Sequence, residues 1–255
     1  MDRLIEAPNW DPDGASLLVN GSGRLFRVPL DAPALVPVET GHADRCNNDH
    51  GISPDGKQIV ISHHTGEGSS IYILPAGGGN PVRVTPKSPS YWHGWSPDGA
   101  QLAYVAKRGE GPFDVYTCPV EGGEETRLTF GEGHSDGPDY NPDGAWIYYN
   151  CDRTGHAQIW RVRPDGTEHA QLFADECVNW FPHPSPDGRT LLYLAYPPGT
   201  EGHPAHKKVA LCLADMDGGN RRRILEFTGG QGTINVPCWA PDGRAFAYVR
   251  YDPTT

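Results

Sequence analysis

Three histidines stand just before a Pro-Asp-Gly tripeptide that recurs along the chain. His50 and His93 each lie five residues before the aspartate of that tripeptide, and His183 lies four residues before it. An imidazole can bind a divalent cation or transfer a proton near neutral pH. The three histidines are therefore candidate ligands for an ion such as Mn or Zn, supported by Gln231. His50 and His93 are in addition the candidate catalytic residues.

Aromatic and amide side chains cluster in the same stretches before the turns. Indole and phenol rings offer flat surfaces on which a sugar ring stacks, and amide or carboxyl groups bond its hydroxyls. A small ligand, with a carbohydrate as the first choice, or a peptide is therefore the expected partner. Asp49 and Asp136 are also alternatives to Gln231 as a supporting metal ligand. The candidate ligand-binding residues are Asn47, Asn48, Asp49, Tyr91, Trp92, Asp136, Asn179, Trp180, Gln231 and Asn235.

Elements of one repeated design must position these residues. At intervals of 42 to 55 residues, Pro-Asp-Gly occupies 12–14, 54–56, 97–99, 142–144, 186–188 and 241–243. The tripeptide, with the residue before it, is typical of a type I turn. Ser, Asn or Asp accepts a hydrogen bond at the first position, and Pro fixes φ at the second. These six copies therefore predict six turns of one kind, and a seventh copy at 164–166 is out of phase and belongs to a different turn.

Each interval has room for four short strands. In the third unit, strand-like segments rich in Val, Tyr and Leu follow the turn at 101–107, 113–120 and 126–130. Strand-length segments without helical periodicity indicate an all-β chain. Four-stranded units of about 44 residues are typical of propeller blades. We therefore expect a single domain over 1–255, a six-bladed β-propeller of four-stranded antiparallel blades.

The recurrent S-P-D-G pattern, which follows a Trp at 95–99, resembles together with Gly-Gly turns the WD40-like PD40 repeat of the TolB-like β-propellers. This resemblance covers essentially the whole chain and implies the fold, with binding roles more common in the family than catalysis. A shorter segment, 181–188 (FPHPSPDG), resembles a metal-binding strand of oligogalacturonate lyases, related propellers that use three His and one Gln. Only His183 matches that motif, because Phe181 stands where the lyases have another histidine.

The propeller topology assigns the candidate residues to one face. If the strands of each blade run outward from the axis, the six Pro-Asp-Gly turns join first and second strands, and all six lie on one face of the propeller. Residues five to nine positions earlier then lie at the opposite mouth of the central channel, where His50, His93 and His183 are expected around one funnel. The long connection 196–208, which carries His203 and His206, falls on the same face and is expected to overhang this funnel.

Two functions fit this arrangement. The favoured one is a binding module whose funnel recognises a small ligand or a peptide, and it asks nothing special of the histidines. The alternative is a divalent-metal-dependent carbohydrate lyase or hydrolase. In that enzyme His50, His93 and His183 hold the ion, and a free histidine acts as base.

The bulk composition restricts the partners and the location. A formal charge of −11 and a pI near 5.4 argue against nucleic acid or an anionic membrane as a partner. The richest apolar run is strand-sized, and the first residues lack a basic segment followed by an apolar one. We expect a cytoplasmic protein, or a periplasmic one if a leader has been removed. The six cysteines lie far apart and are expected as buried free thiols.

The last expectation concerns the sixth blade. After the turn at 241–243 only 245–252 remains as a further strand, and the first residues start too late to supply the outer strands. We therefore expect an incomplete sixth blade of about two strands, with an unpaired edge at 245–252. An exposed edge favours pairing. A homodimer through this blade, or its coverage by another segment, is the expected result.

Overall fold

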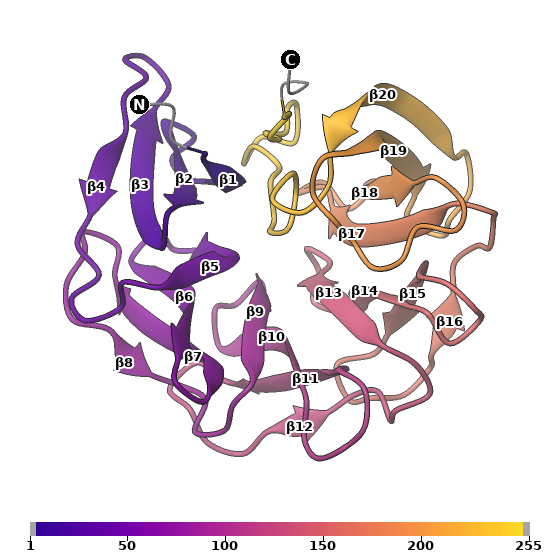
Figure 1. The fold of residues 1–255 in the computed structure, drawn as a ribbon, viewed down its shortest axis with the longest axis horizontal. Helices are drawn as coiled ribbons and strands as arrows, with labels where there is room; N and C mark the ends of the chain where they lie inside the picture. Colours follow the sequence, from indigo (N-terminus) through magenta and orange to yellow (C-terminus); the bar gives the residue numbers. More distant parts are fainter. Residues whose placement is uncertain (1–3, 252–255) are drawn as a thin grey trace.

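The computed structural model describes residues 4–251, and all of the regular structure in this range is β-strand. Five sheets form, each with four antiparallel strands that follow one another in chain order across the sheet. Figure 1 shows the sheets as blades around a common centre, with the first strand of each blade innermost. The all-β propeller with four-stranded antiparallel blades is therefore confirmed.

Each blade takes its four strands consecutively from the chain. The first blade contains β1 (Glu6–Trp10), β2 (Ser16–Gly21), β3 (Arg24–Pro29) and β4 (Val36–Val38). The second contains β5 (Cys46–Ile52), β6 (Gln58–Thr65), β7 (Gly68–Pro75) and β8 (Val82–Arg83). The third contains β9 (Ser90–Trp95), β10 (Gln101–Ala106), β11 (Asp114–Pro119) and β12 (Thr126–Arg127).

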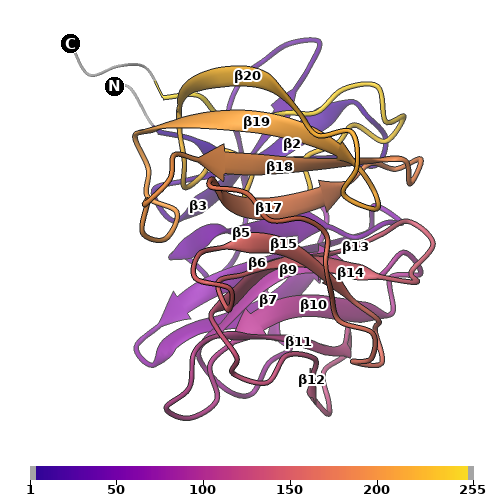
Figure 2. The same ribbon diagram turned by 90° about the vertical axis from the view of Figure 1, so that its right-hand side faces the viewer.

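The last two blades follow the same plan. The fourth contains β13 (Ser135–Tyr140), β14 (Ile147–Cys151), β15 (Gln158–Val162) and β16 (Ala170–Gln171). The fifth contains β17 (Val178–Pro184), β18 (Thr190–Tyr196), β19 (Lys207–Asp215) and β20 (Arg222–Gly229). Figure 2 shows the strands of this fifth blade side by side, from β17 to β20.

The six Pro-Asp-Gly turns all form. In each of them the glycine N–H donates to the carbonyl three residues earlier at 2.8–2.9 Å, as from Gly14 to Asp11 and from Gly243 to Ala240. The six glycines have φ between 67° and 73°, a conformation that suits a residue without a Cβ. Five of the turns join the first and second strands of the five blades, so they lie at one end of the strands.

The predicted number of blades is wrong. The described residues contain five complete four-stranded sheets rather than six, and the segment 230–251 around the sixth turn forms only one isolated bridge, between Trp239 and Phe246. In Figure 1 this segment, drawn in yellow, runs between β1 and β17. The expected strand at 245–252 is not formed over 245–251, and residue 252 lies outside the described range. The turn motif marks a turn, whereas a sheet also needs neighbouring strands to pair with.

The inner strands carry β-bulges. The register between the first and second strands shifts between Cys46 and His50 in β5, and between Trp180 and His183 in β17. In β9 the residues on either side of His93 pair with neighbours on β10, while His93 itself is left without a partner. A bulge leaves the extra residues out of the ladder and bends the strand, so their side chains need not follow the period-2 alternation.

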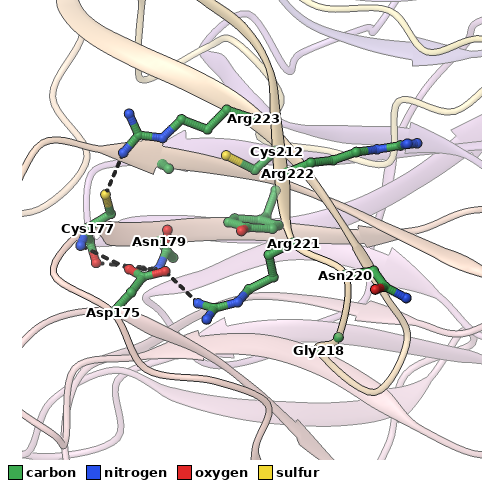
Figure 3. A pocket seen from close by; sticks show the side chains of 12 residues that line it. Asp175, Cys177, Asn179, Cys212, Gly218, Asn220, Arg221, Arg222 and Arg223 are labelled. Atoms are coloured by element: carbon green, nitrogen blue, oxygen red, sulfur yellow. Dashed lines mark hydrogen bonds and ion pairs between the residues drawn. The ribbon is translucent and has the colours of Figure 1, made fainter.

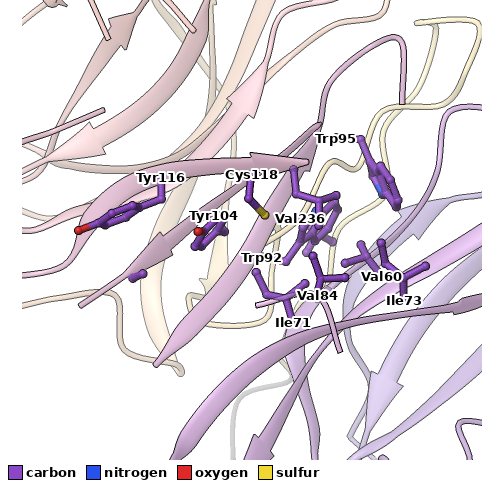
Figure 4. Packing of buried hydrophobic residues seen from close by; sticks show 13 residues of the cluster. Val60, Ile71, Ile73, Val84, Trp92, Trp95, Tyr104, Tyr116, Cys118 and Val236 are labelled. Carbon is purple, nitrogen blue, oxygen red and sulfur yellow. The ribbon is translucent and has the colours of Figure 1, made fainter. Parts of the chain in front are cut away.

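The core is built between neighbouring blades. One cluster joins Val60 and Ile71 of the second blade to Trp92 and Tyr104 of the third, all of them fully buried. Figure 4 shows Trp92 within this cluster, close to Ile71. Gly51 of β5 leaves the space for its indole, because a Cβ at that position would lie 2.3 Å from the ring. Blade packing therefore depends on a missing side chain as well as on large ones.

Two further expectations concern the cysteines and the membrane. All six cysteines are free; five are buried and Cys177 is partly exposed. Burial raises the pKa of the Cys46 thiol to about 12 and that of Cys212 to about 11. Within residues 4–251 there is no helix with the length and apolar character needed to cross a membrane.

Candidate functional site

One cavity lies at the end of the blades opposite the Pro-Asp-Gly turns. Its volume is about 570 Å³, and residues from all five blades line it. Antiparallel topology brings to this end both the beginnings of the inner strands and the turns between second and third strands. The turn between β2 and β3 accordingly contributes Ser22 and Gly23 to the lining. We refer to this space as the mouth cavity.

Many of the residues selected from the sequence line the mouth cavity. They come from the inner strands, in or next to their bulges, and from the segment that follows β20. These residues are Asn47, Asn48, Asp49, Tyr91, His93, Asp136, Gln231 and Asn235. The connection 196–208 also reaches the cavity, as predicted, through His203, whereas His206 stacks on Tyr251 with ring centroids 4.5 Å apart.

Asp136 is the centre of the polar contacts in the cavity. Its Oδ1 accepts a hydrogen bond from Nε2 of His93 at 3.0 Å, while its Oδ2 lies 3.5 Å from Nε2 of His134 and 3.7 Å from Nε2 of His203. Nδ1 of His93 donates to the carbonyl of Asn235 at 3.3 Å. Both nitrogens of His93 therefore face acceptors, which is the arrangement of an imidazolium.

The pKa shifts agree with this geometry. Burial acts to lower the pKa of His93, but the hydrogen bond and the charge of Asp136 outweigh it, so the pKa is raised. Burial acts to raise the pKa of Asp136, and the bonds from His134 and His93 instead hold it well below its usual range. Burial lowers the pKa of His203. The hydrogen bond and the charge of Asp136 also outweigh burial at His134 and raise its pKa, so the cavity contains Asp136 paired with His93 and His134, and a neutral imidazole at His203.

Asp49 has a different environment from Asp136. Asp49 is only 7% exposed, and its carboxyl group forms no ion pair with any residue in the range 4–251. Burial raises its pKa to about 7; the charge of Asp136 raises it further, and His93 acts in the opposite direction. Asp49 is therefore a buried acid that exchanges its proton near neutral pH, close to a carboxylate that does not.

A belt of aromatic rings forms the side of the cavity that belongs to the third, fourth and fifth blades. Tyr91 and Phe113 have ring centroids 5.8 Å apart, and Phe113 and His134 are 5.4 Å apart. Phe181 lies 5.2 Å from His203 and 6.4 Å from His93. These rings give the cavity an apolar wall beside its polar groups.

Two histidines predicted as metal ligands do not line the mouth cavity. His50 is fully buried, its Nε2 lies 3.5 Å from the carbonyl of Leu18, and burial lowers its pKa to about 4. His183 contacts Asp139 through Nδ1 at 2.9 Å and the carbonyl of Ile234 through Nε2 at 2.7 Å. Both residues come directly after a bulge, where pairing with the second strand resumes.

Three residues predicted to bind ligand also lie outside this lining. Trp92 is fully buried in the core between the second and third blades, and Trp180 packs in the core of the fifth blade. Asn179 lines a second cavity of about 570 Å³ on the fifth blade, where its Nδ2 donates to Asp175 at 3.0 Å. Figure 3 shows Asn179 there beside Asp175 and Cys177. Each of the three pairs in regular register with the second strand of its blade, so its side chain points to one face of the sheet.

The predicted metal-ligand set does not converge. His93 faces the mouth cavity. His183 directs both ring nitrogens to a buried carboxyl group and a backbone carbonyl, while His50 directs Nε2 to a backbone carbonyl and its Nδ1 is buried without a hydrogen-bond partner among the described residues. In the part of the chain that the structure describes, no group of three or more His, Cys, Asp or Glu side chains has a metal-binding arrangement. The predicted Mn or Zn cofactor therefore has no ligand set formed by these histidines.

Several lining residues were missed by sequence reasoning. Glu6 and Asn20 face each other across β1 and β2, and Phe113 precedes β11. His134 and Phe181 lie in the stretches before the turns, yet neither was selected as a ligand contact. The topology contained a usable signal, because turns between second and third strands share the face of the cavity. Applied to residues 20–23, that rule would have found this part of the site.

Comparison with known proteins places the chain in a family. Residues 92–202 match the family model described as PD40, the TolB β-propeller domain. An uncharacterized protein of Agrobacterium fabrum, Atu1656, is 51% identical over 253 residues, which cover 98% of this chain and 86% of the relative. A solved structure assigned as TolB from Agrobacterium tumefaciens has 50% identity and a TM-score of 0.97, covering 100% of this chain and 92% of the other. The chain belongs to the TolB-like PD40 β-propellers.

More distant matches agree with the fold. The Tol-Pal system protein TolB of Francisella tularensis is 26% identical over 94% of this chain, which spans only 55% of that relative. An oligogalacturonate lyase in complex with manganese has a TM-score of 0.60 at 15% identity, covering 86% of this chain and 64% of the lyase. At that identity the likeness shows a shared propeller architecture and nothing about chemistry.

Proposed function

We propose that this TolB-like propeller is a binding module that recognises a carbohydrate in the mouth cavity. The observation that carries the proposal is the combination of an aromatic belt with polar groups around one space of about 570 Å³. Cavities of this size, with a few converging polar groups on an apolar wall, are the usual sites of small ligands. Tyr91 offers a partly exposed ring for stacking on a sugar, and Asn47 and Asn235 offer amide groups for its hydroxyls.

The metal-dependent lyase or hydrolase receives no support from a specific observation. Its ligand set required His50 and His183 to share a site with His93. Both are instead buried between neighbouring blades, where His50 contacts Leu18 of the first blade and His183 contacts Asp139 of the fourth. The cytoplasmic location also has no support in the comparisons, so it and the periplasmic alternative stay predictions, as does the homodimer.

Thermal-shift screening tests the proposal. The panel contains neutral, acidic and amino oligosaccharides together with short peptides, and the variant is Tyr91→Ala. We expect at least one oligosaccharide to raise the Tm of the wild type, and the variant to bind it at least tenfold more weakly, about 1.4 kcal/mol. Phe130→Ala is the control, because Phe130 is an exposed aromatic residue outside the mouth cavity.

Two results would contradict the proposed function. The first is a panel in which no oligosaccharide changes the Tm, or in which only peptides do. The second is a bound sugar whose affinity is equally high in the wild type, Tyr91→Ala and Phe130→Ala, because the binding site would then lie elsewhere.

A further inference from the structure

The charged groups of the mouth cavity are unevenly distributed by type. Glu6, Asp49 and Asp136 contribute carboxyl groups, whereas no Lys or Arg is found among the described residues that line it. The only basic side chains there are histidines, and the chain as a whole has a formal charge of −11. An anionic ligand would therefore enter a negative cavity of a negative molecule.

The two histidines with a raised pKa, His93 and His134, both direct Nε2 to Asp136 and so are already engaged by a carboxylate. Both ring nitrogens of His93 are used, one by Asp136 and the other by the carbonyl of Asn235. His203 is neutral, since burial lowers its pKa. A uronic acid or a phosphate would have to compete with Asp136 for the charges of His93 and His134. Breaking a buried ion pair of this kind leaves its carboxylate uncompensated, which is costly.

Hydrogen-bond acceptors gather on the wall formed by the first two blades. Glu6 and Asn20 are paired directly across β1 and β2, and β5, which carries Asp49, packs against both strands. The Oε1 atom of Glu6 accepts a hydrogen bond from the hydroxyl of Tyr251 at 2.6 Å. Asp49 has no cationic partner within ion-pair distance in residues 4–251. The wall thus presents two carboxyl groups with unused acceptor capacity.

Asn20 adds an independent observation on the same wall. The residue is 5% exposed and lines the cavity, and its Oδ1 is buried without any hydrogen-bond partner in the described residues. A buried polar atom left without a partner costs about 1–3 kcal/mol. A donor group supplied from the cavity would recover this free energy, so the wall is suited to a ligand that donates several hydrogen bonds and carries positive charge.

From this wall we infer that the ligand is an amino sugar, with its ammonium group against Glu6, Asn20 and Asp49 and its ring against the aromatic belt. A primary ammonium has three donors and one positive charge, which matches an acceptor wall that contains two carboxyl groups. The inference rests on the proposed function, since it specifies the class of carbohydrate that the mouth cavity takes.

Binding of three tetrasaccharides that differ in charge tests the amino-sugar inference separately from the proposed carbohydrate-binding function. They are the β-1,4-linked tetramers of glucosamine and N-acetylglucosamine and the α-1,4-linked tetramer of galacturonic acid, titrated calorimetrically into the full chain at pH 7.5. We expect the glucosamine tetramer to bind at least tenfold more tightly than the neutral one, and the acidic one to bind most weakly. Stronger binding at low salt should accompany the first result.

Paired substitutions locate the charge. Asp49→Asn keeps the shape of the side chain and should weaken binding of the glucosamine tetramer at least tenfold, with less than a twofold change for the N-acetylated tetramer. Asp44→Asn is the matched control, because it removes the same charge from an exposed side chain outside the lining and should change neither affinity by more than twofold. Thermal melting of both variants shows whether they remain folded.

The outcomes are distinguishable. If the N-acetylated or the acidic tetramer binds as tightly as the glucosamine tetramer, the amino-sugar inference is overturned while the carbohydrate-binding function stands. If none of the three binds, the inference is overturned, and the screening panel then decides the function separately. Equal losses in Asp49→Asn and Asp44→Asn would also overturn it, because the charge would then act through the whole molecule and not through the acceptor wall.

Discussion

Asp49 links the mouth cavity to the stability of the protein. Its carboxyl group has a pKa of about 7 when folded, mainly because it is buried, against 3.8 for an ordinary aspartate. The folded state therefore binds a proton more tightly than the unfolded state between these two values. The free energy of unfolding must then decrease as the pH rises from about 4 to about 7, and the change is complete above that range.

Replacing Asp49 by Asn removes this dependence, because the amide resembles the protonated acid at every pH. We expect the advantage of Asp49→Asn over the wild type to grow between pH 4 and pH 8, by up to about 4 kcal/mol for a shift of about three pKa units. Urea denaturation at several pH values measures it. The facing groups His93, Asp136 and Tyr91 remain in both proteins, so the difference isolates Asp49. A difference that is constant with pH would show that Asp49 ionises normally.

The residues of the site show what sequence reasoning could reach. The Pro-Asp-Gly spacing was sufficient to predict which stretches approach the mouth, and His93, Asp49 and Asn235 lie there. Spacing alone could not distinguish His93 from His50, because each stands five residues before the aspartate of its turn. His93 is the unpaired residue of its bulge, whereas His50 resumes pairing after a bulge and is buried. Bulges have no reliable sequence signature, and they decide which side chains face the cavity.

At the scale of the elements, each blade depends on how closely it packs against the next. Gly51 of β5 and Trp92 of β9 pack closely between the second and third blades, since a Cβ on Gly51 would lie 2.3 Å from the indole. Trp92 is fully buried, so it has little freedom to move away. We expect Gly51→Ala to lower the free energy of unfolding by about 3 kcal/mol through overpacking.

The control for Gly51→Ala is Gly66→Ala, because an added Cβ there would meet nothing within 4 Å and the glycine has no positive φ. That variant should differ from the wild type by less than about 0.5 kcal/mol in chemical denaturation. In the double variant Gly51→Ala, Trp92→Phe, the smaller phenyl ring leaves space for the new methyl group. The double variant should therefore be less unstable than the sum of the single variants. Strict additivity would mean that the two side chains do not collide.

The whole molecule is closed without a sixth sheet. The segment 230–251 bonds to the first blade through Ala7, whose N–H donates to Gly232 at 2.7 Å, and to the fifth through Trp239, whose Nε1 donates to the carbonyl of His183 at 2.9 Å. The repeat predicted the blade plan correctly and the blade number wrongly. A repeat counts units of sequence, and whether the last unit becomes a sheet depends on strands that must come from elsewhere in the molecule.

Asn9 is the residue on which this closure can be tested. It is 5% exposed, its Oδ1 accepts from the N–H of Ile52 at 2.9 Å, and its Nδ2 donates to the carbonyl of Pro237 at 2.7 Å. One amide thus ties the first blade to both the second blade and the closing segment. Asn9→Ala leaves the buried N–H of Ile52 and the partly buried carbonyl of Pro237 without this partner, and we expect a loss of about 2–4 kcal/mol in the free energy of unfolding.

Asn80→Ala provides the comparison, because Asn80 is exposed and the substitution removes the same kind of side-chain amide away from the closure of the propeller. It should lose less than about 0.5 kcal/mol. Hydrogen exchange distinguishes closure from a local effect: in Asn9→Ala the amides of Gly232 to Val249 should exchange faster, while those of β10 and β14, away from the junction, keep their protection. Stability within 0.5 kcal/mol of the wild type, or uniform loss of protection in all blades, would show that the Asn9 amide does not hold the ring closed.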